Sequence, residues 1–203
     1  MNNKGCFGIG TAGMVILGLI ALIGFWAFGN YNGLVSSNNE VLSKWSNVET
    51  VYQKRANLIP NLEKTVKSYA KFEQETLTKV IEARAKATQV TVDPTNMTEE
   101  DMAKFQQAQS ELSGTLGRLM VVAEQYPNLK ADQQYINFQR EYTAIENSIR
   151  TETVYYNDAV KLFNNKVESF PTNLLTMIFT KFKAKPFFKA DAGAAKAPEV
   201  FNN

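Results

Sequence analysis

The hydrophobic pattern divides the chain into one uncharged apolar run and a long stretch of helical periodicity. Residues 7–28 contain no charged side chain. At about 1.5 Å per helical residue they reach about 33 Å, enough to cross a bilayer core of about 30 Å. From there to about residue 182, apolar residues recur at three- and four-residue steps rather than at alternate positions. The pattern predicts an all-α protein, with a single N-terminal transmembrane helix followed by an antiparallel bundle of long helices.

Proline, asparagine and capping residues predict where the helices end. Asn57 and Pro60 interrupt the first periodic stretch, because proline has no backbone N–H and asparagine can cap a new first turn. Residues 90–97 predict a loop, and Thr98, followed by three acidic residues, predicts the start of a helix that ends near residue 125. The last long helix is expected over residues 132–169, where Pro171 stops it. It carries a heptad stripe typical of packing against other helices: Tyr135, Tyr142, Ile149, Tyr156, Phe163 and Phe170.

Two arrangements of these helices remain open. A turn near Asn57 would fold the chain back and form a four-helix bundle, which we favour because it covers the apolar stripe around Trp45. The alternative is a kinked three-helix rod, in which association of copies into a homo-oligomer could cover that stripe. Either way we expect a cytoplasmic N-terminus (residues 1–6), an anchor (7–29), an extracytoplasmic bundle (30–189) and a disordered tail (190–203).

The flanks of the apolar run favour a retained anchor over a cleaved signal peptide. Phe25, Trp26 and Phe28 suit the headgroup boundary, and they make a bulky ending for a cleavage site, although cleavage stays open. Lys4 precedes the run, and the first cation after it is Lys44. The positive-inside rule then predicts a cytoplasmic amino terminus.

Composition removes most routes to catalysis. The chain has no histidine and only one cysteine, Cys6, which excludes imidazole bases, Ser-His and Cys-His pairs, thiolate metal sites and disulfides. Charges nearly balance, with 22 Lys and Arg against 20 Asp and Glu, so no global field points to nucleic acid. We therefore expect no catalytic residues, no cofactor and no metal site.

Two segments are candidate sites. Asn57, Pro60 and Asn61 form either a partner-docking corner or a purely architectural one. Residues 174–189 combine an apolar helical face with lysines and no acid, which is typical of a helix at a lipid interface; alternatively, the apolar face caps the bundle and the lysines are solvated. The candidate membrane contacts are Phe179, Lys181, Phe182, Lys183, Lys185, Phe187, Phe188 and Lys189.

Short motifs recur along the chain after the apolar run: Tyr31-Asn32-Gly33-Leu34-Val35, residues 54–62 with Leu58-Ile59-Pro60-Asn61-Leu62, Ala83-Arg84, Tyr126-Pro127-Asn128, Tyr156-Asn157, Phe170-Pro171 and Phe187-Phe188. Together with the predicted anchor, these motifs resemble the LemA family of bacterial membrane proteins. The resemblance implies one span in the bacterial cell (inner) membrane, an extracytoplasmic helical bundle and no established enzymatic activity. The family includes a magnetosome membrane protein, which suggests a role in membrane organisation.

These observations support two main hypotheses. The first is a non-enzymatic, membrane-anchored scaffold that docks envelope proteins through its bundle. The second is a membrane-contacting protein that shapes or senses lipid through residues 174–189. An unrecognised hydrolase is a remote third.

Overall fold

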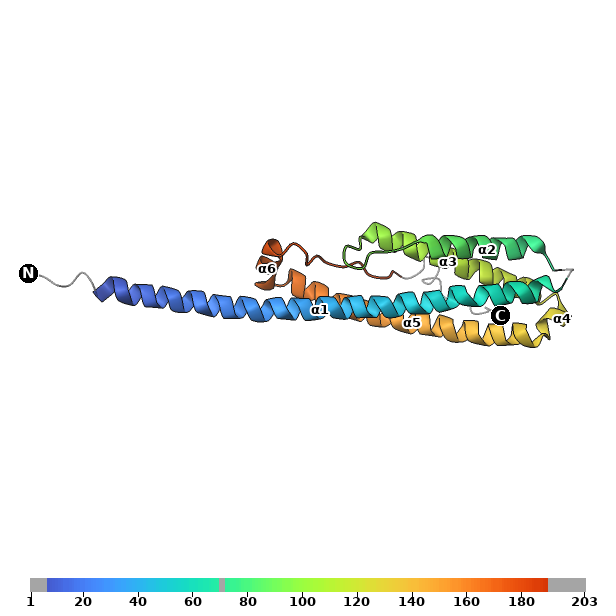
Figure 1. Ribbon diagram of the computed structural model, residues 1–203, viewed down its shortest axis with the longest axis horizontal. Helices are drawn as coiled ribbons and strands as arrows, with labels where there is room; N and C mark the ends of the chain where they lie inside the picture. The colour runs from blue at the N-terminus through green and yellow to red at the C-terminus, as the bar shows by residue number, and fades with distance from the viewer. Residues whose placement is uncertain (1–6, 70–71, 190–203) are drawn as a thin grey trace, which may run out of the picture. The chain divides into compact units, whose positions relative to one another are not determined.

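The computed structural model describes residues 7–69 and 72–189 and is entirely helical in its regular structure over them (Figure 1). Predictions for residues 1–6 and 190–203 lie outside the described residues. The helices are α1 (Phe7–Lys67), α2 (Gln74–Gln89), α3 (Glu99–Ala123), α4 (Pro127–Lys130), α5 (Gln133–Glu168) and α6 (Thr172–Ile178). The predicted all-α class is confirmed.

The chain forms two compact units. Unit 1 consists of Met1–Glu40 and Lys161–Ala184, and unit 2 of Val41–Val160 and Lys185–Asn203. Both α1 and α5 contribute residues to both units. Within the described residues, only α1 is long and apolar enough to cross a membrane, and its most apolar window is fully unburied.

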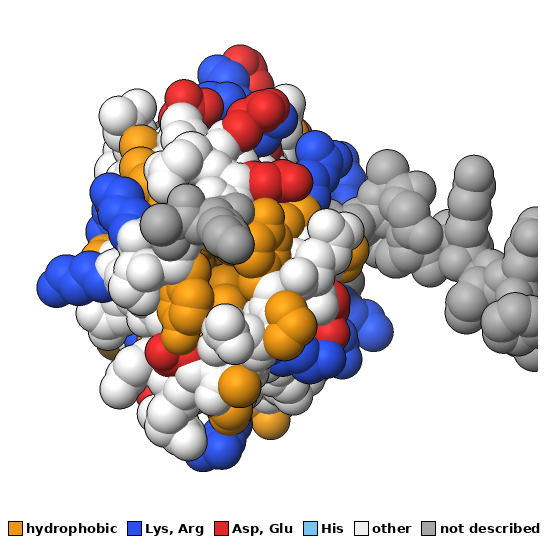
Figure 2. Space-filling model, turned by 90° about the vertical axis from the view of Figure 1, so that its right-hand side faces the viewer, with side chains coloured by type: hydrophobic (Ala, Val, Ile, Leu, Met, Phe, Trp, Pro, Cys, Tyr) orange, Lys and Arg blue, Asp and Glu red, His pale blue; other side chains and the backbone are white. Residues whose placement is uncertain are grey.

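The core of unit 2 draws on α1, α2, α3, α4 and α5, and α2 packs along α3. Ile59, Leu62, Leu116 and Leu129 are almost completely buried there. Figure 2 shows the end of this unit where α4 lies: hydrophobic side chains gather in the middle of that face, with charged ones around them. At this end the ring of Phe72 packs against the ring of Tyr126, with the two ring centroids 5.1 Å apart.

The predicted local signals for α3 and α5 are confirmed. Thr98 caps α3 through a reciprocal capping box with Asp101, which satisfies two otherwise unpaired N–H groups. Asp132 accepts hydrogen bonds from the N–H groups of Gln134 and Tyr135 at the start of α5. Helix α5 ends at Glu168, before Pro171.

The predicted turn at Asn57 and Pro60 is wrong, because α1 runs through both residues to Lys67. A proline inside a helix leaves the carbonyl four residues earlier without its donor, which here is the carbonyl of Ala56. The Arg84 side chain, from α2, donates its Nε–H to that carbonyl at 2.9 Å. A tertiary hydrogen bond thus replaces the missing backbone one, and the described chain first leaves the helix after Lys67.

The predicted helical face over residues 174–182 is also only partly formed. Helix α6 ends at Ile178, and residues 183–189 have no regular structure. Phe179 and Phe182 instead turn onto Tyr31, with ring centroids 4.9 and 5.7 Å apart. These aromatic contacts, which a helix pattern cannot anticipate, stabilise the turn that ends α6.

Candidate functional site

The predicted corner at Asn57, Pro60 and Asn61 is a continuous stretch of helix α1 in the structure. Asn57 and Asn61 lie one helical turn apart on an exposed face of α1, and Pro60 is half-buried. The Asn57 Oδ1 accepts a hydrogen bond from Gln53 at 2.9 Å. Because the helix continues, these residues cap nothing, and a docking role for them stays a prediction.

A buried polar cluster that was not predicted from the sequence lies close by on α1, two residues before Asn57. Arg55 is only 2% exposed. Its guanidinium donates to the Gln109 backbone carbonyl and side-chain oxygen on α3, and to Glu146 Oε1 on α5 at 3.0 Å. It also lies 4.9 Å from the centre of the Tyr52 ring. Arg55 thereby connects α1 to α3 and α5 within unit 2.

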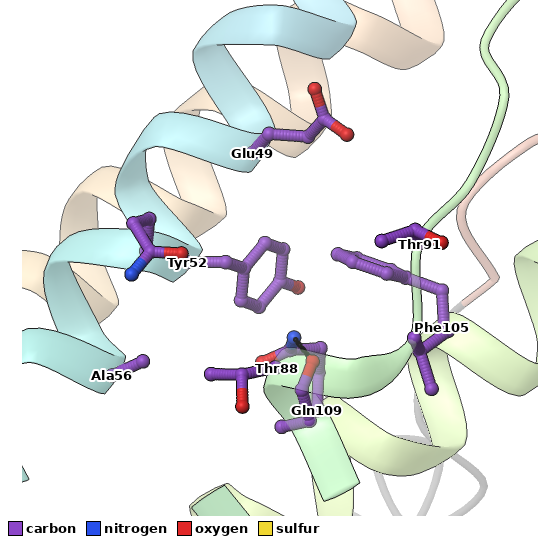
Figure 3. Close-up of a pocket in the computed structure, with 10 residues that line it drawn as sticks. Glu49, Tyr52, Ala56, Thr88, Thr91, Phe105 and Gln109 are labelled. Carbon is purple, nitrogen blue, oxygen red and sulfur yellow. Dashed lines mark hydrogen bonds between the residues drawn. The ribbon is translucent and has the colours of Figure 1, made fainter. Parts of the chain in front are cut away.

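Two small cavities flank this cluster and share Tyr52 and Gln109 in their walls. The larger, of about 150 Å³, also includes Phe105 and Thr88 (Figure 3). The second, of about 110 Å³, is lined by Arg55 and Glu146 together with two serines. Pockets for drug-sized ligands are typically about 300–1,000 Å³, so these cavities suit water or a very small polar molecule.

A short apolar surface lies beside the end of the predicted span in unit 1. Thr172 Oγ1 lies 3.4 Å from Asn30 Oδ1, and Lys181 donates to the Tyr31 hydroxyl at 2.9 Å. These contacts fasten α6 and the residues after it to α1 just past the apolar run. Three nearby apolar side chains remain strongly exposed: Phe170 (79%), Met177 (72%) and Ile178 (72%).

The remaining candidate membrane contacts divide between the two units. Lys183 is exposed in unit 1. In unit 2, Lys185 is buried and donates to the carbonyls of Pro94 and Thr95, and burial lowers the pKa of its ammonium group. We name residues 185–189 the strap. Since Lys185 and Phe188 pack within unit 2, the structure offers fewer residues for lipid contact than the pattern suggested.

Two side-chain amides hold the backbone of the strap. The Asn157 amide donates to the Phe188 carbonyl at 3.1 Å and accepts from the Phe188 N–H at 2.9 Å. The Gln106 amide makes the same pair of bonds with Lys189, at 2.8 and 3.3 Å. The Tyr156 hydroxyl donates to the Pro186 carbonyl at 3.1 Å.

The ring of Phe188 lies in an aromatic pocket of unit 2. Its centroid is 5.9 Å from Trp45, 6.3 Å from Phe105 and 5.4 Å from Tyr156. The predicted apolar stripe around Trp45 is thus covered, since Trp45 is 1% exposed. Burial raises the pKa of the Tyr156 phenol and keeps it a hydrogen-bond donor.

One signal could have located the Arg55 cluster. Arg55 occupies a position of the three- and four-residue apolar stripe between Val51 and Ile59, where a charge needs a buried partner. No comparable signal marks Asn157 and Gln106, because polar residues on a helix are usually solvated. Among the described residues, no group of three or more Cys, Asp or Glu side chains is arranged to hold a metal ion.

The sequence is similar to a family model and to several bacterial proteins. The family model described as the LemA family matches residues 44–201. "Protein LemA" of Metamycoplasma hominis is 30% identical over 161 residues, covering 78% of this chain and 70% of the relative. "Magnetosome protein MamQ 2" of Paramagnetospirillum magneticum is 25% identical over 195 residues, covering 87% and 71%. "Magnetosome protein MamQ" of Magnetospirillum gryphiswaldense is 24% identical over 194 residues, covering 86% and 71%. Since the family model covers most of the sequence, this chain belongs to the LemA family.

Proposed function

We propose that this chain is a non-enzymatic scaffold of the bacterial inner membrane that docks other proteins of the cell envelope. In this proposal α1 crosses the bilayer once with its amino terminus in the cytoplasm, and unit 2 forms an antiparallel four-helix bundle on the other side. The charge-free first half of α1, the positions of Lys4 and Lys44, and the relatives named magnetosome proteins support it. A sequence without histidine supports a role other than catalysis.

One observation carries the membrane part of the proposal. In unit 1, Thr172 of α6 contacts Asn30, and Phe179, just after α6, contacts Tyr31, immediately beyond the apolar run of α1. Helix α6 exposes Met177 and Ile178 there. Burying such a side chain in an apolar phase yields about 1.5–3 kcal/mol, and Lys183 nearby adds about 1 kcal/mol toward anionic lipid. This free energy would not be gained if α6 stayed in water, so we place α6 at the interface between bilayer and water.

The same observation favours lipid shaping or sensing as a second candidate function. In this second function, α6 and Phe170 make the lipid contact. Residues 185–189, which belong to the predicted segment 174–189, do not take part, because they pack within unit 2. A short interfacial helix beside a span can respond to lipid packing.

A depth-sensitive dye tests the position of α6. The full chain carrying Cys6→Ser and Ile178→Cys is labelled with an environment-sensitive fluorophore and reconstituted in vesicles with lipid-borne quenchers. We expect quenching about threefold stronger than for a dye at Thr143→Cys, which lies on the exposed face of α5. Equal quenching at the two positions would show that α6 stays in water.

Photocrosslinking in cells tests the docking role. A photoreactive residue replaces Asn61 or Asn147, two exposed positions of unit 2 on α1 and α5. We expect one position to capture the same envelope protein in repeated experiments, while a matched residue in the apolar run, Leu19, captures lipid. Lipid alone at all three positions would instead support the lipid-shaping function.

A further inference from the structure

We propose that the groove of unit 2 that holds the strap is a peptide-docking site. Its ligand is an extended segment of another envelope protein with the pattern Lys-x-x-Phe-Lys, which displaces the strap. This inference rests on the scaffold function proposed above, and it names the chemistry of the docked partner.

The groove binds the backbone of the strap through hydrogen bonds, as peptide-binding sites commonly do. Asn157 and Gln106 each form two hydrogen bonds with the backbone of one residue, one as donor and one as acceptor. An added β-strand is bound in the same way, except that here side-chain amides on two helices supply the partners. Any extended segment presents these groups, whereas a helix uses them internally.

Two side-chain anchors then select the sequence. Lys185 inserts its ammonium group between the carbonyls of Pro94 and Thr95, in the loop before α3. Three residues later, Phe188 fills the pocket made by Trp45, Phe105 and Tyr156. A lysine and an aromatic residue at this spacing are therefore the minimal ligand.

The charge of the groove matches a basic segment. Glu99 pairs with Lys189 at 2.8 Å. Burial lowers the pKa of the Lys185 ammonium group, and the negative charge of Asp93 opposes this lowering in part. Asp93 is itself exposed and held by the backbone N–H of Thr95 at 2.9 Å. An acidic residue at either ligand position would meet a like charge, so the groove discriminates against acidic segments.

The strap is an incomplete occupant. The indole Nε1 of Trp45 is buried and has no hydrogen-bond acceptor among the described residues, although unpaired buried donors are costly. A segment that places an acceptor there gains a hydrogen bond that the strap does not make. One such bond raises affinity about fivefold, so it offsets part of the advantage of the tethered strap, whose effective concentration is about millimolar.

A synthetic peptide tests the site in the full chain. The probe is a labelled heptapeptide with the sequence of residues 183–189, Lys-Ala-Lys-Pro-Phe-Phe-Lys. The host is the full chain in lipid nanodiscs carrying Phe188→Ala, which weakens its own strap and leaves the groove intact. We expect the probe to bind this host about tenfold more tightly than the unchanged chain, because the competing strap has lost its anchor.

Matched variants make the result specific. Adding Asn157→Ala to the host should weaken probe binding about tenfold, since two backbone bonds are lost. Asn147→Ala, at an exposed position of the same helix, should leave binding unchanged. A probe with alanine in place of its second phenylalanine should not bind.

Three outcomes would overturn the proposal. The first is a host with unchanged helical circular dichroism that does not bind the probe saturably. The second is an affinity for the probe that does not change when Asn157→Ala is added. The third is exchange of straps between copies, seen as covalent dimers when a photoreactive residue replaces Phe187, which is 38% exposed; the groove would then serve self-association.

Two further measurements separate the possible failures. If the Phe188→Ala chain loses helix, a photoreactive probe is added in excess to the unchanged chain, and crosslinks beside Trp45 replace the titration. Their absence counts against the proposal. If the probe fails while crosslinking at Asn61 or Asn147 still captures an envelope protein, the groove assignment is wrong and the scaffold function stands.

Discussion

Replacing Arg55 with methionine is expected to lower the free energy of unfolding of unit 2 by about 3 kcal/mol. Methionine fills much of the volume but donates no hydrogen bond, so the Gln109 carbonyl and side chain lose their donor inside the core. Glu146 is 29% exposed and regains water. For this reason the expected cost lies at the lower end of the range for breaking a buried ion pair.

The measurement is urea denaturation of the full chain in detergent micelles, followed by far-ultraviolet circular dichroism. Lys54→Met provides the control, because Lys54 is the exposed neighbour of Arg55 on α1, and its cost should stay below about 0.5 kcal/mol. Adding Glu146→Gln to Arg55→Met should restore part of the loss by removing the unpaired carboxylate. A cost below about 1 kcal/mol for Arg55→Met would mean that the cluster does not fasten the three helices.

Replacing Arg84 with methionine is expected to destabilise the chain by about 1–2 kcal/mol, and only while Pro60 is present. With Pro60, the Ala56 carbonyl depends on the Arg84 Nε–H. In a Pro60→Ala background, the N–H of residue 60 can bond to that carbonyl, so the loss of Arg84 should matter little.

A double-mutant cycle of Arg84→Met and Pro60→Ala, measured by the same denaturation, gives the coupling. We expect a coupling energy of about 1 kcal/mol. Lys86→Met serves as the control, because Lys86 lies on an exposed face of α2 and pairs with Glu111 in a surface ion pair. Additive effects of Arg84→Met and Pro60→Ala would show that Arg84 is not the reason why α1 continues through the proline.

The proposals divide the chain into a lipid-facing and a protein-facing part. In unit 1, the exposed Met177 and Ile178 beside the end of the apolar run suit a bilayer interface. In unit 2, the strap groove combines backbone clamps, an aromatic pocket and acidic side chains, which suit a basic peptide. Substitutions can change the α6 surface of unit 1 without changing the strap groove of unit 2. Membrane contact and partner docking can therefore be tested independently.

Features that depend on neighbours a few residues away could be predicted from the sequence. The heptad stripe from Tyr135 to Phe163, the Thr98 cap and the loop over residues 90–97 were predicted and agree with the structure. Each rests on hydrogen bonds or apolar spacing within a few residues, which propensity and periodicity describe directly. The last predicted member of the stripe, Phe170, is wrong, because it lies beyond the end of α5 and is 79% exposed.

The course of the chain at Pro60 and at residues 185–189 depends instead on contacts between residues far apart in sequence. Local rules end a helix at a proline, but a donor 28 positions away in sequence keeps α1 intact. The strap is basic and aromatic, a composition that predicts a lipid interface, yet Asn157, Gln106 and the loop carbonyls bind it within unit 2. These hydrogen bonds join residues that are distant in sequence, and Arg84, Asn157 and Gln106 carry no periodic signal that marks them as partners.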